Sequence, residues 1–193
     1  KRNAIGVVDA ITAEDFGDFP DTNLAEALQR IPGVSIDRFN GEGSRITVRG
    51  LGPDFNLTLL NGRQMPSAGS RSFDFLDVAT EGVSAVEVYK TSRANLPTGG
   101  IGATVNLMTS RPLNSPGLRG VLTAKALHET SVSGSSDLNK FTPEVSGLYS
   151  QTFADDTFGV LLSGSYSKRE NREEEAHVAQ WFENRGVGDQ ATI

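Results

Sequence analysis

The sequence predicts an α+β fold. A compact domain with a mixed β-sheet and short helices is expected over residues 1–113, and the first antiparallel strands of a truncated transmembrane β-barrel over residues 114–193. For the first domain, Ser44–Pro66 alternates between apolar and polar residues, contains a hairpin signal and follows a short helical pattern. For the second region, the sequence changes to segments of alternating polarity with the length of barrel strands.

Composition excludes several classes of protein. The chain has 193 residues, with 18 basic and 24 acidic side chains and a net charge of −6, which argues against a nucleic-acid binder. There is no cysteine, so a disulfide scaffold and a thiolate metal site are excluded. His128 and His177 are far apart in the sequence, and we expect neither a metal site nor a cofactor.

The first elements follow from periodicity and breakers. Ala4–Ile11 is apolar and β-branched, which predicts a strand, and Thr12 is placed to cap a short helical turn through Phe16. Leu24, Leu28 and Ile31 share one face of a predicted helix that Pro32-Gly33 ends. Val34–Phe39 is a short strand candidate.

The segment Ser44–Pro66 carries the clearest local signals. Ile46 and Val48 alternate with polar residues, as in a half-buried strand. Asn56–Leu60 is a second strand candidate, and Asn61-Gly62 follows it. This dipeptide favours a type I′ turn, which requires positive φ at both central residues, so we expect Arg63–Met65 to return as the next strand.

The first domain continues with three predicted elements. Ser72–Val83 is expected to be mostly helical, because acidic residues stand in its first turns. Ala85–Lys90 alternates as a strand does, and Ala103–Thr109 is a further strand candidate that ends before Pro112. Strands and helices mixed in this way indicate one α+β domain.

Three longer strands are predicted in the second region: Leu118–Leu127, Glu144–Phe153 and Thr157–Lys168. The connection over residues 128–143 is long and polar, whereas Ala154–Asp156 is short. Barrels of outer membranes have long extracellular loops and short periplasmic turns, so the first strand should run outward. The charge run Arg169–Glu175 is interpreted as a solvated loop. The third strand has two unlike faces. The apolar face is formed by Phe158, Val160, Leu162 and Tyr166, and the serine-rich face by Ser163, Ser165 and Ser167.

Catalytic motifs are missing from the sequence. It contains no G-x-S-x-G elbow and no H-E-x-x-H zinc helix. Gly99-Gly100-Ile101-Gly102 does not match the G-x-G-x-x-G dinucleotide fingerprint. We therefore expect no enzymatic activity.

Several segments, in order, resemble the plug domain of TonB-dependent outer-membrane receptors, and the resemblance covers roughly residues 5–112. They are Leu24–Ile36, Arg49-Gly50 after an Ile/Val strand, Leu57–Gly62, Val86–Lys90 and Gly99–Pro112. The chain would then be a plug with the first strands of its barrel.

This resemblance implies a function. In the family the plug lies inside the barrel lumen of the outer membrane and gates energy-coupled uptake of a scarce nutrient. The implied partners are the rest of the barrel, a small nutrient ligand and the TonB energy-coupling complex, which acts through a segment upstream of Lys1. The amino-acid sequence of the hairpin segment resembles that of receptors often linked to saccharide uptake, while a siderophore, haem or cobalamin stays open as the substrate.

The resemblance also implies roles for particular residues. Arg49, and more loosely Arg45, match plug arginines that pair with glutamates on the barrel wall, and their even spacing places both on one strand face. The alternative is that both are solvated. Asp54, Phe55, Ser67 and Arg71 lie in loops where the family contacts its substrate at the plug apex, although these loops could be ordinary connections.

Two other classes of function stay open on the sequence. One is a soluble binding or adhesion module with a C-terminal β-meander. The other is a porin-like channel, because a set of barrel strands can exist without coupling to TonB.

Overall fold

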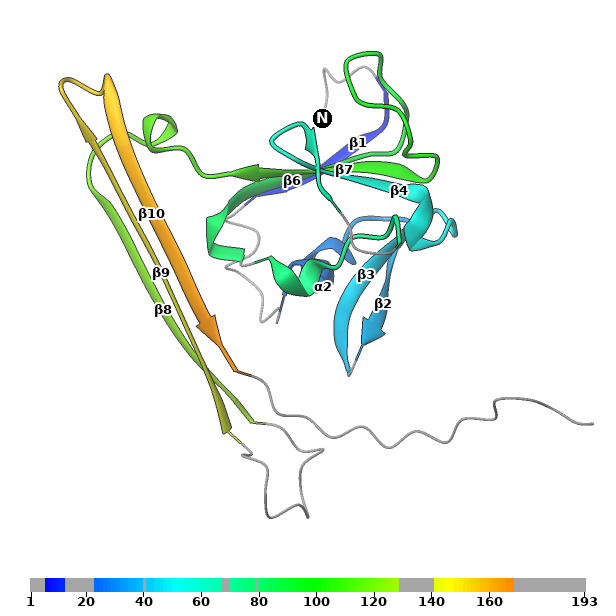
Figure 1. Cartoon of the computed structure of the whole chain (residues 1–193), viewed down its shortest axis with the longest axis horizontal. Helices are drawn as coiled ribbons and strands as arrows, with labels where there is room; N and C mark the ends of the chain where they lie inside the picture. The colour runs from blue at the N-terminus through cyan, green and yellow to red at the C-terminus, as the bar shows by residue number, and fades with distance from the viewer. Residues whose placement is uncertain are drawn as a thin grey trace, which may run out of the picture.

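The computed structural model describes residues 6–12, 23–39, 41–66, 70–78, 80–128 and 141–168. It contains a five-stranded sheet in the order β1-β6-β7-β4-β5, a two-stranded sheet β2-β3 and a three-stranded sheet β10-β9-β8 (Figure 1). In chain order the strands of the first two sheets are β1 (Val8–Thr12), β2 (Val34–Phe39), β3 (Glu42–Val48), β4 (Asn56–Leu60), β5 (Arg63–Gln64), β6 (Val83–Tyr89) and β7 (Ala103–Thr109).

The five-stranded sheet is mixed, as the sequence predicts. β6 pairs antiparallel with both β1 and β7, whereas β4 and β7 are parallel, with Asn56 opposite Ala103. The parallel pair places the starts of β4 and β7 side by side at one end of the sheet. The loops before these two strands therefore meet there.

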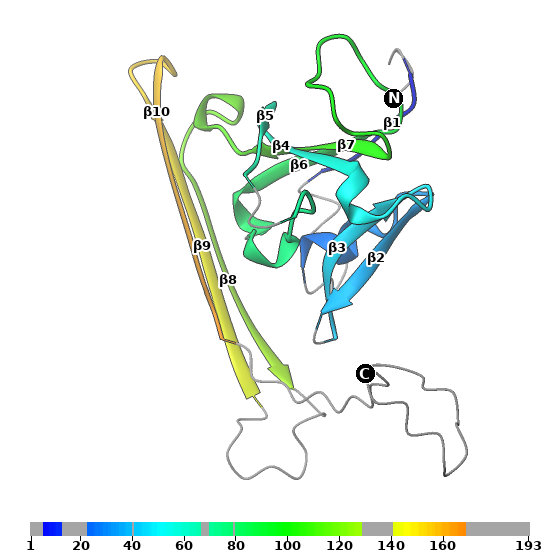
Figure 2. The ribbon, with the colours of Figure 1, turned by 45° about the vertical axis from the view of Figure 1, so that its right-hand side comes forward.

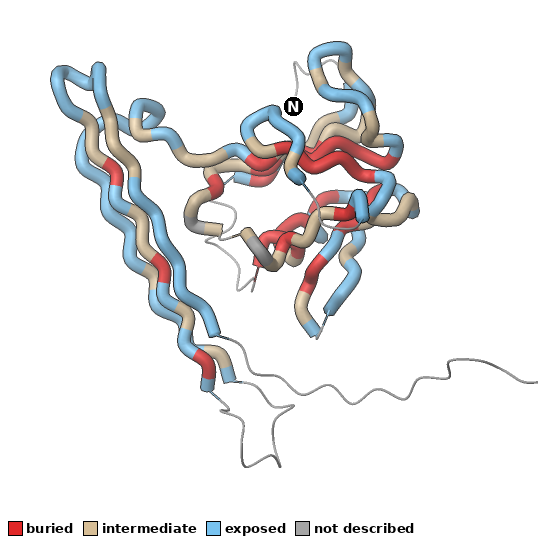
Figure 3. Tube along the Cα trace, viewed as in Figure 1, coloured by how far each residue is buried: buried red, intermediate tan, exposed pale blue. Residues whose placement is uncertain are grey.

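The helix α2 (Leu24–Leu28) begins at Asn23, whose Oδ1 accepts a hydrogen bond from the Glu26 amide at 3.1 Å. The helix ends at Leu28, before the predicted Ile31, and the chain continues in tighter turns in which the Ile31 amide donates to the Leu28 carbonyl at 3.0 Å. Its side chains pack with those of the five-stranded sheet and of β3 to form the main core. Figure 3 shows that the buried residues gather along these elements. Core residues include Leu24, Leu28, Ile46, Val48, Phe75, Val86, Val88, Val105 and Leu107.

The predicted hairpin is confirmed. Asn61 has φ 51° and Gly62 has φ 81°, so both central residues of the turn are left-handed. β5 pairs antiparallel with β4, Arg63 lying opposite Leu60. The return strand is shorter than predicted, although the Met65 amide still donates to the Thr58 carbonyl at 3.0 Å.

The prediction of a helix over Ser72–Val83 is wrong. The segment forms two 3₁₀ turns, η2 (Phe75–Asp77) and η3 (Thr80–Gly82). Phe75 is 1% exposed, and its ring lies edge-on to that of the half-buried Phe73 at 5.1 Å, so burial of Phe75 overrides local helix propensity. Thr12, the predicted cap of a short turn, is the last residue of β1, whereas residues 13–16 of that turn and the charge run at 169–175 lie outside the described residues.

The three-stranded sheet contains β8 (Arg119–His128), β9 (Phe141–Phe153) and β10 (Phe158–Ser167), paired antiparallel throughout. All three predicted strands are therefore present. β9 begins at Phe141, three residues before its predicted start at Glu144. It therefore includes Pro143, although proline is a poor strand residue. Whether residues 114–193 belong to a barrel stays a prediction.

The three-stranded sheet stands beside the first domain (Figures 1 and 2). Both views place the β9–β10 turn at the same end of the molecule as the β4–β5 hairpin. The tip of the β2–β3 hairpin points to the opposite end, toward the end of β8. In the described part of the chain, no helix has the length and apolar character needed to cross a membrane.

Candidate functional site

Arg49 occupies an unusual backbone position. β3 ends at Val48, and Arg49 and Gly50 both have positive φ, 56° and 74°. The Arg49 amide donates to the Gly33 carbonyl at 2.8 Å, which fixes the turn. Positive φ is uncommon for a residue with a side chain. Strand alternation therefore does not extend to Arg49, and the inference that Arg45 and Arg49 share one strand face is wrong.

Both arginines present exposed side chains. Arg45 lies on β3 opposite Asp37, and neither Arg45 nor Arg49 makes a side-chain hydrogen bond or ion pair with any residue that the structure describes. This exposure is compatible with a solvated guanidinium and with a partner outside the described chain. The role of the two residues as a plug–barrel lock stays a prediction.

Three of the four residues predicted to contact substrate meet at the end of the sheet where β4 and β7 start. The Asp54 carboxylate accepts the Ser72 amide at 3.0 Å, and Arg71 Nη2 donates to the Gly99 carbonyl at 3.0 Å. The Gly102 amide donates to the carbonyl of Phe55 at 3.0 Å. Asp54 and Arg71 thus hold loops together, which the sequence did not predict. Ser67 lies outside the described residues.

The glycines at this junction are required by close backbone approach. A Cβ on Gly100 would lie 2.5 Å from the Ala103 carbonyl oxygen, and one on Gly102 would lie 2.6 Å from Asn56 Oδ1. Asn56 is itself buried, and its amide donates to the Ile46 carbonyl at 2.9 Å. The glycine run therefore serves packing of the loop against β4 and β7.

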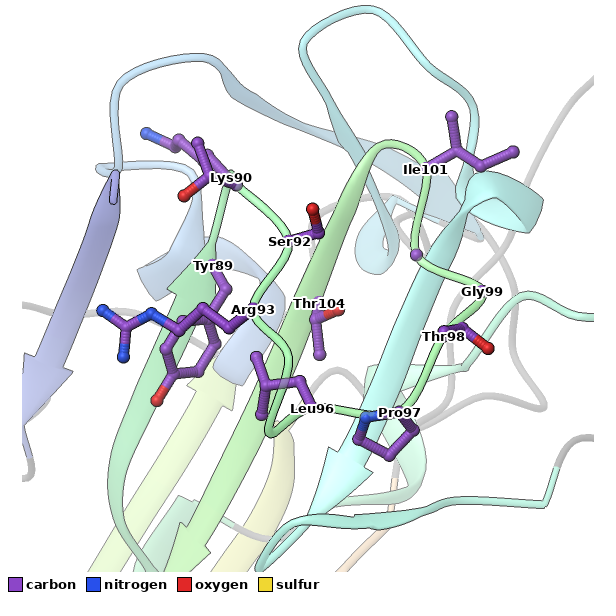
Figure 4. Close-up of a pocket in the computed structure, with 12 residues that line it drawn as sticks. Tyr89, Lys90, Ser92, Arg93, Leu96, Pro97, Thr98, Gly99, Ile101 and Thr104 are labelled. Carbon is purple, nitrogen blue, oxygen red and sulfur yellow. The ribbon is translucent and has the colours of Figure 1, made fainter. Parts of the chain in front are cut away.

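A groove of about 500 Å³ lies beside this junction, under the loop between β6 and β7 (Figure 4). Its lining includes Leu96, Pro97, Thr98, Ile101 and Thr104, while Lys90 and Arg93 extend away from its centre. No motif in the sequence predicts this groove. Its only sequence signal is the run of small residues between two strands.

A polar cluster borders the groove. The Tyr89 hydroxyl donates to Glu87 Oε2 at 2.6 Å, and the Arg93 guanidinium lies 4.8 Å from the centre of the Tyr89 ring. Burial, followed by the Glu87 hydrogen bond and charge, raises the pKa of Tyr89 to about 12. The raised pKa extends the pH range in which the phenol stays protonated from about 10 to about 12.

The three-stranded sheet has two unlike faces. A Cβ on Gly159 would lie 2.7 Å from Pro112, and the Ser163 hydroxyl lies 3.6 Å from the position of a Cβ on Gly82, so odd-numbered residues of β10 face the first domain. Cross-strand partners share a face. The inward face is mainly polar, with Thr123, Lys125, Thr142, Glu144, Ser146, Ser150, Thr152, Ser163 and Ser165, and it carries the Lys125–Glu144 ion pair at 3.4 Å.

The outward face is apolar and aromatic. Its residues include Leu122, Phe141, Val145, Tyr149, Phe153, Phe158, Leu162 and Tyr166, all of them exposed. Two aromatic pairs mark its two ends. The His128 and Phe141 rings lie 4.8 Å apart at one end, and those of Phe153 and Phe158 lie 6.4 Å apart at the other. Aromatic residues are also enriched at both edges of the apolar band of membrane barrels, so this placement is the one that the barrel prediction requires.

Comparison with known proteins identifies the class. Residues 1–104 match the TonB-dependent Receptor Plug Domain family, which is more than half of the chain. The chain therefore belongs to the TonB-dependent receptor plug family, whose members are outer-membrane receptors. The resemblance noted in the sequence is confirmed.

Individual relatives agree with this assignment. The vitamin B12 transporter BtuB of Photobacterium profundum is 30% identical over 111 residues, and the ferric enterobactin receptor PirA of Pseudomonas aeruginosa is 32% identical over 133 residues. These matches cover 56% and 60% of the chain but only 18% of each relative. The crystal structure of the siderophore receptor PirA from Pseudomonas aeruginosa superposes with a TM-score of 0.63 at 27% identity, over 88% of this chain and 30% of that one.

Proposed function

We propose that the chain is the plug and first barrel strands of a TonB-dependent transporter that gates the uptake of a scarce nutrient across the outer membrane. The observation that carries this is the two-faced sheet attached to a plug-family domain. Its apolar, aromatic face points away from the plug and its polar face points toward it. Alternation of this kind places lipid on one side and a lumen on the other.

The orientation of the plug follows from the connections. The short β9–β10 turn belongs on the periplasmic side, because periplasmic turns of such barrels are short. The β4–β5 hairpin points to the same side (Figure 2). The β2–β3 hairpin then points outward, and Phe39 near its tip is 63% exposed. We propose that this hairpin is part of the surface that substrate meets first.

The substrate class is narrowed by the relatives. Their names describe vitamin B12 and ferric enterobactin as the cargo of those proteins. We therefore propose a metal chelate or a corrinoid as the substrate here. The names of these relatives do not support the saccharide that the hairpin segment suggested. An adhesion module and an unplugged porin-like channel are disfavoured by the match to a plug family.

Uptake in cells tests the proposal. The intact receptor containing this chain is expressed in cells that lack their own receptors, with and without TonB, and supplied with iron-labelled enterobactin or cobalt-labelled cobalamin. Accumulation of either label only when TonB is present is expected. The same receptor without residues 1–113, and therefore without its plug, is the control for ungated diffusion. Equal accumulation without TonB would contradict energy-coupled transport.

A further inference from the structure

The strand β1 is weakly held to the rest of the plug. It is an edge strand of five residues, and among the described strands it pairs only with β6. Ile11 is its one side chain in the buried core. Polar contacts also hold β1, among them the hydrogen bond that the Val7 amide, just before its start, donates to Thr91 Oγ1 at 3.0 Å. An edge strand with so little apolar burial can separate without dissolving the core.

Lys90 is a buried polar anchor of β1. Its side chain is 7% exposed, and its ammonium donates to Asp9 Oδ2 at 2.6 Å and to the Pro32 carbonyl at 2.5 Å. By contrast, the Lys125 side chain in the Lys125–Glu144 pair is 39% exposed. A buried ammonium is costly unless it is paired, so Lys90 depends on both partners.

The second partner of Lys90 lies in a turn that also holds Arg49. The Pro32 carbonyl accepts a hydrogen bond from the Lys90 ammonium, and the adjacent Gly33 carbonyl accepts one from the Arg49 amide at 2.8 Å. The left-handed backbone of Arg49 is held by this contact and by the two backbone hydrogen bonds between Val48 and Leu51, at 3.2 and 3.1 Å. A continuous path therefore runs from Asp9 through Lys90 and the Pro32-Gly33 turn to Arg49.

We propose that Lys90 is a positioning residue that couples the docking of β1 to the conformation of the Arg49-Gly50 turn. While β1 is docked, Asp9 holds the ammonium in place and the ammonium holds the Pro32 carbonyl. When β1 separates, the ammonium loses its carboxylate and turns toward water, and the Pro32-Gly33 turn loses a donor. The Arg49 turn then opens more readily. This is a property of the fold and does not depend on the cargo or on the energy source.

Amide hydrogen exchange with residue resolution tests the coupling in the 193-residue chain folded in detergent. Thr91→Val removes a β1 anchor without touching the Pro32-Gly33 turn. It should speed exchange in β1 by about tenfold, the effect of one lost hydrogen bond. Coupling predicts that the Arg49 amide exchanges faster in parallel. In a Lys90→Met background, Thr91→Val should still loosen β1 but leave the Arg49 rate unchanged.

Two controls make the result decisive. Lys125→Met removes a lysine from the three-stranded sheet and should change neither probe. Amides of β7 report global stability and should stay at their wild-type rates. Asp9→Asn, neutral and of equal size, supplies a second background if Lys90→Met does not fold. An Arg49 rate that ignores Thr91→Val in the unmodified background overturns the proposal, as does equal acceleration in β7.

Discussion

The Gly62 amide donates to Asn106 Oδ1 at 2.8 Å, so the turn between β4 and β5 is fastened to the neighbouring strand β7. Asn61 completes the attachment. Its amide donates to the Leu107 carbonyl at 2.8 Å, and its Oδ1 accepts the Thr109 amide at 3.0 Å. The left-handed turn is thus fixed both by its own sequence and by a strand distant in the chain.

Gly62→Val should destabilise the plug. Gly62 has φ 81°, which a β-branched residue adopts only with strain of about 1–3 kcal/mol. Thermal unfolding of the variant should therefore begin at a lower temperature. Gly52→Val is the matched control, since Gly52 has φ −56° and nothing lies within 4 Å of its added Cβ. Equal melting temperatures of the two variants would contradict the strain argument.

Tyr89 should stabilise the plug below pH 10 and lose this contribution between pH 10 and about 12. Its pKa is raised from 10.0 to about 12, so the folded state holds the phenolic proton more tightly than the unfolded chain does. As pH rises through this window, the unfolded state ionises first and stability falls. Tyr89→Phe should show a shallower fall over the same window. Urea unfolding at several pH values measures the difference, and parallel curves would refute the assignment.

Local signals in the sequence predicted local structure well. The Asn61-Gly62 turn needs only two adjacent residues, and alternation identified the strands of the three-stranded sheet. Non-local contacts were not predictable. The parallel pairing of β4 with β7 and burial of Phe75 depend on the whole fold, and the latter replaced the predicted helix at Ser72–Val83 with two short turns.

The candidate site was predicted only in part, for the same reason. Asp54 and Arg71 were chosen as polar loop residues, but their partners, the Ser72 amide and the Gly99 carbonyl, are distant in sequence. Alternation also placed Arg49 on a strand, whereas its contact with Gly33 takes it out of the strand. The groove beside Tyr89 arises from the loop path, which no short motif encodes.

Arg71→Ala and Asp54→Ala in the intact receptor should weaken binding of the transported ligand while the plug stays folded. Because both side chains hold loops that border the start of β4 and β7, their loss should also loosen those loops, with a stability cost of about 1 kcal/mol each. Calorimetry with the ligand identified by uptake gives the affinities. Arg63→Ala, an exposed change on β5, is the control. Unchanged affinity in both loop variants would place the substrate site on other surfaces.

The 193-residue chain should self-associate in plain buffer, whereas a version ending at Leu113 should be monomeric. β8 and β10 are open edges, and the outward face between them exposes large apolar side chains such as Leu122 at 82% and Leu162 at 65%. Light scattering with and without detergent measures the association. If both versions are ordered monomers in buffer, the prediction that residues 114–193 are barrel strands is wrong.

Arg49 should hold the plug in its barrel. The Arg49-Gly50 turn displays an exposed guanidinium with no side-chain partner among the described residues, and such a group suits bidentate pairing with a carboxylate on the remaining barrel wall. Breaking a buried pair of this kind costs roughly 3–5 kcal/mol, because the other charge stays unpaired. Arg49→Gln in the intact receptor should therefore raise conductance across a lipid bilayer. Glutamine keeps a side chain at φ 56°, so backbone strain is nearly unchanged and the lost charge is isolated.

Two further variants separate a lock from general surface charge. Arg45→Gln tests the second predicted lock residue on β3, and Arg63→Gln removes an exposed arginine from β5 that has no predicted role. A lock at Arg49 predicts leakage in Arg49→Gln with an unchanged melting temperature of the plug, and wild-type conductance in Arg63→Gln. Leakage in Arg45→Gln as well would extend the lock along β3. Wild-type tightness in Arg49→Gln would instead show that the Arg49 guanidinium is solvated in the receptor, and that the left-handed turn serves only to connect β3 with the loop before β4.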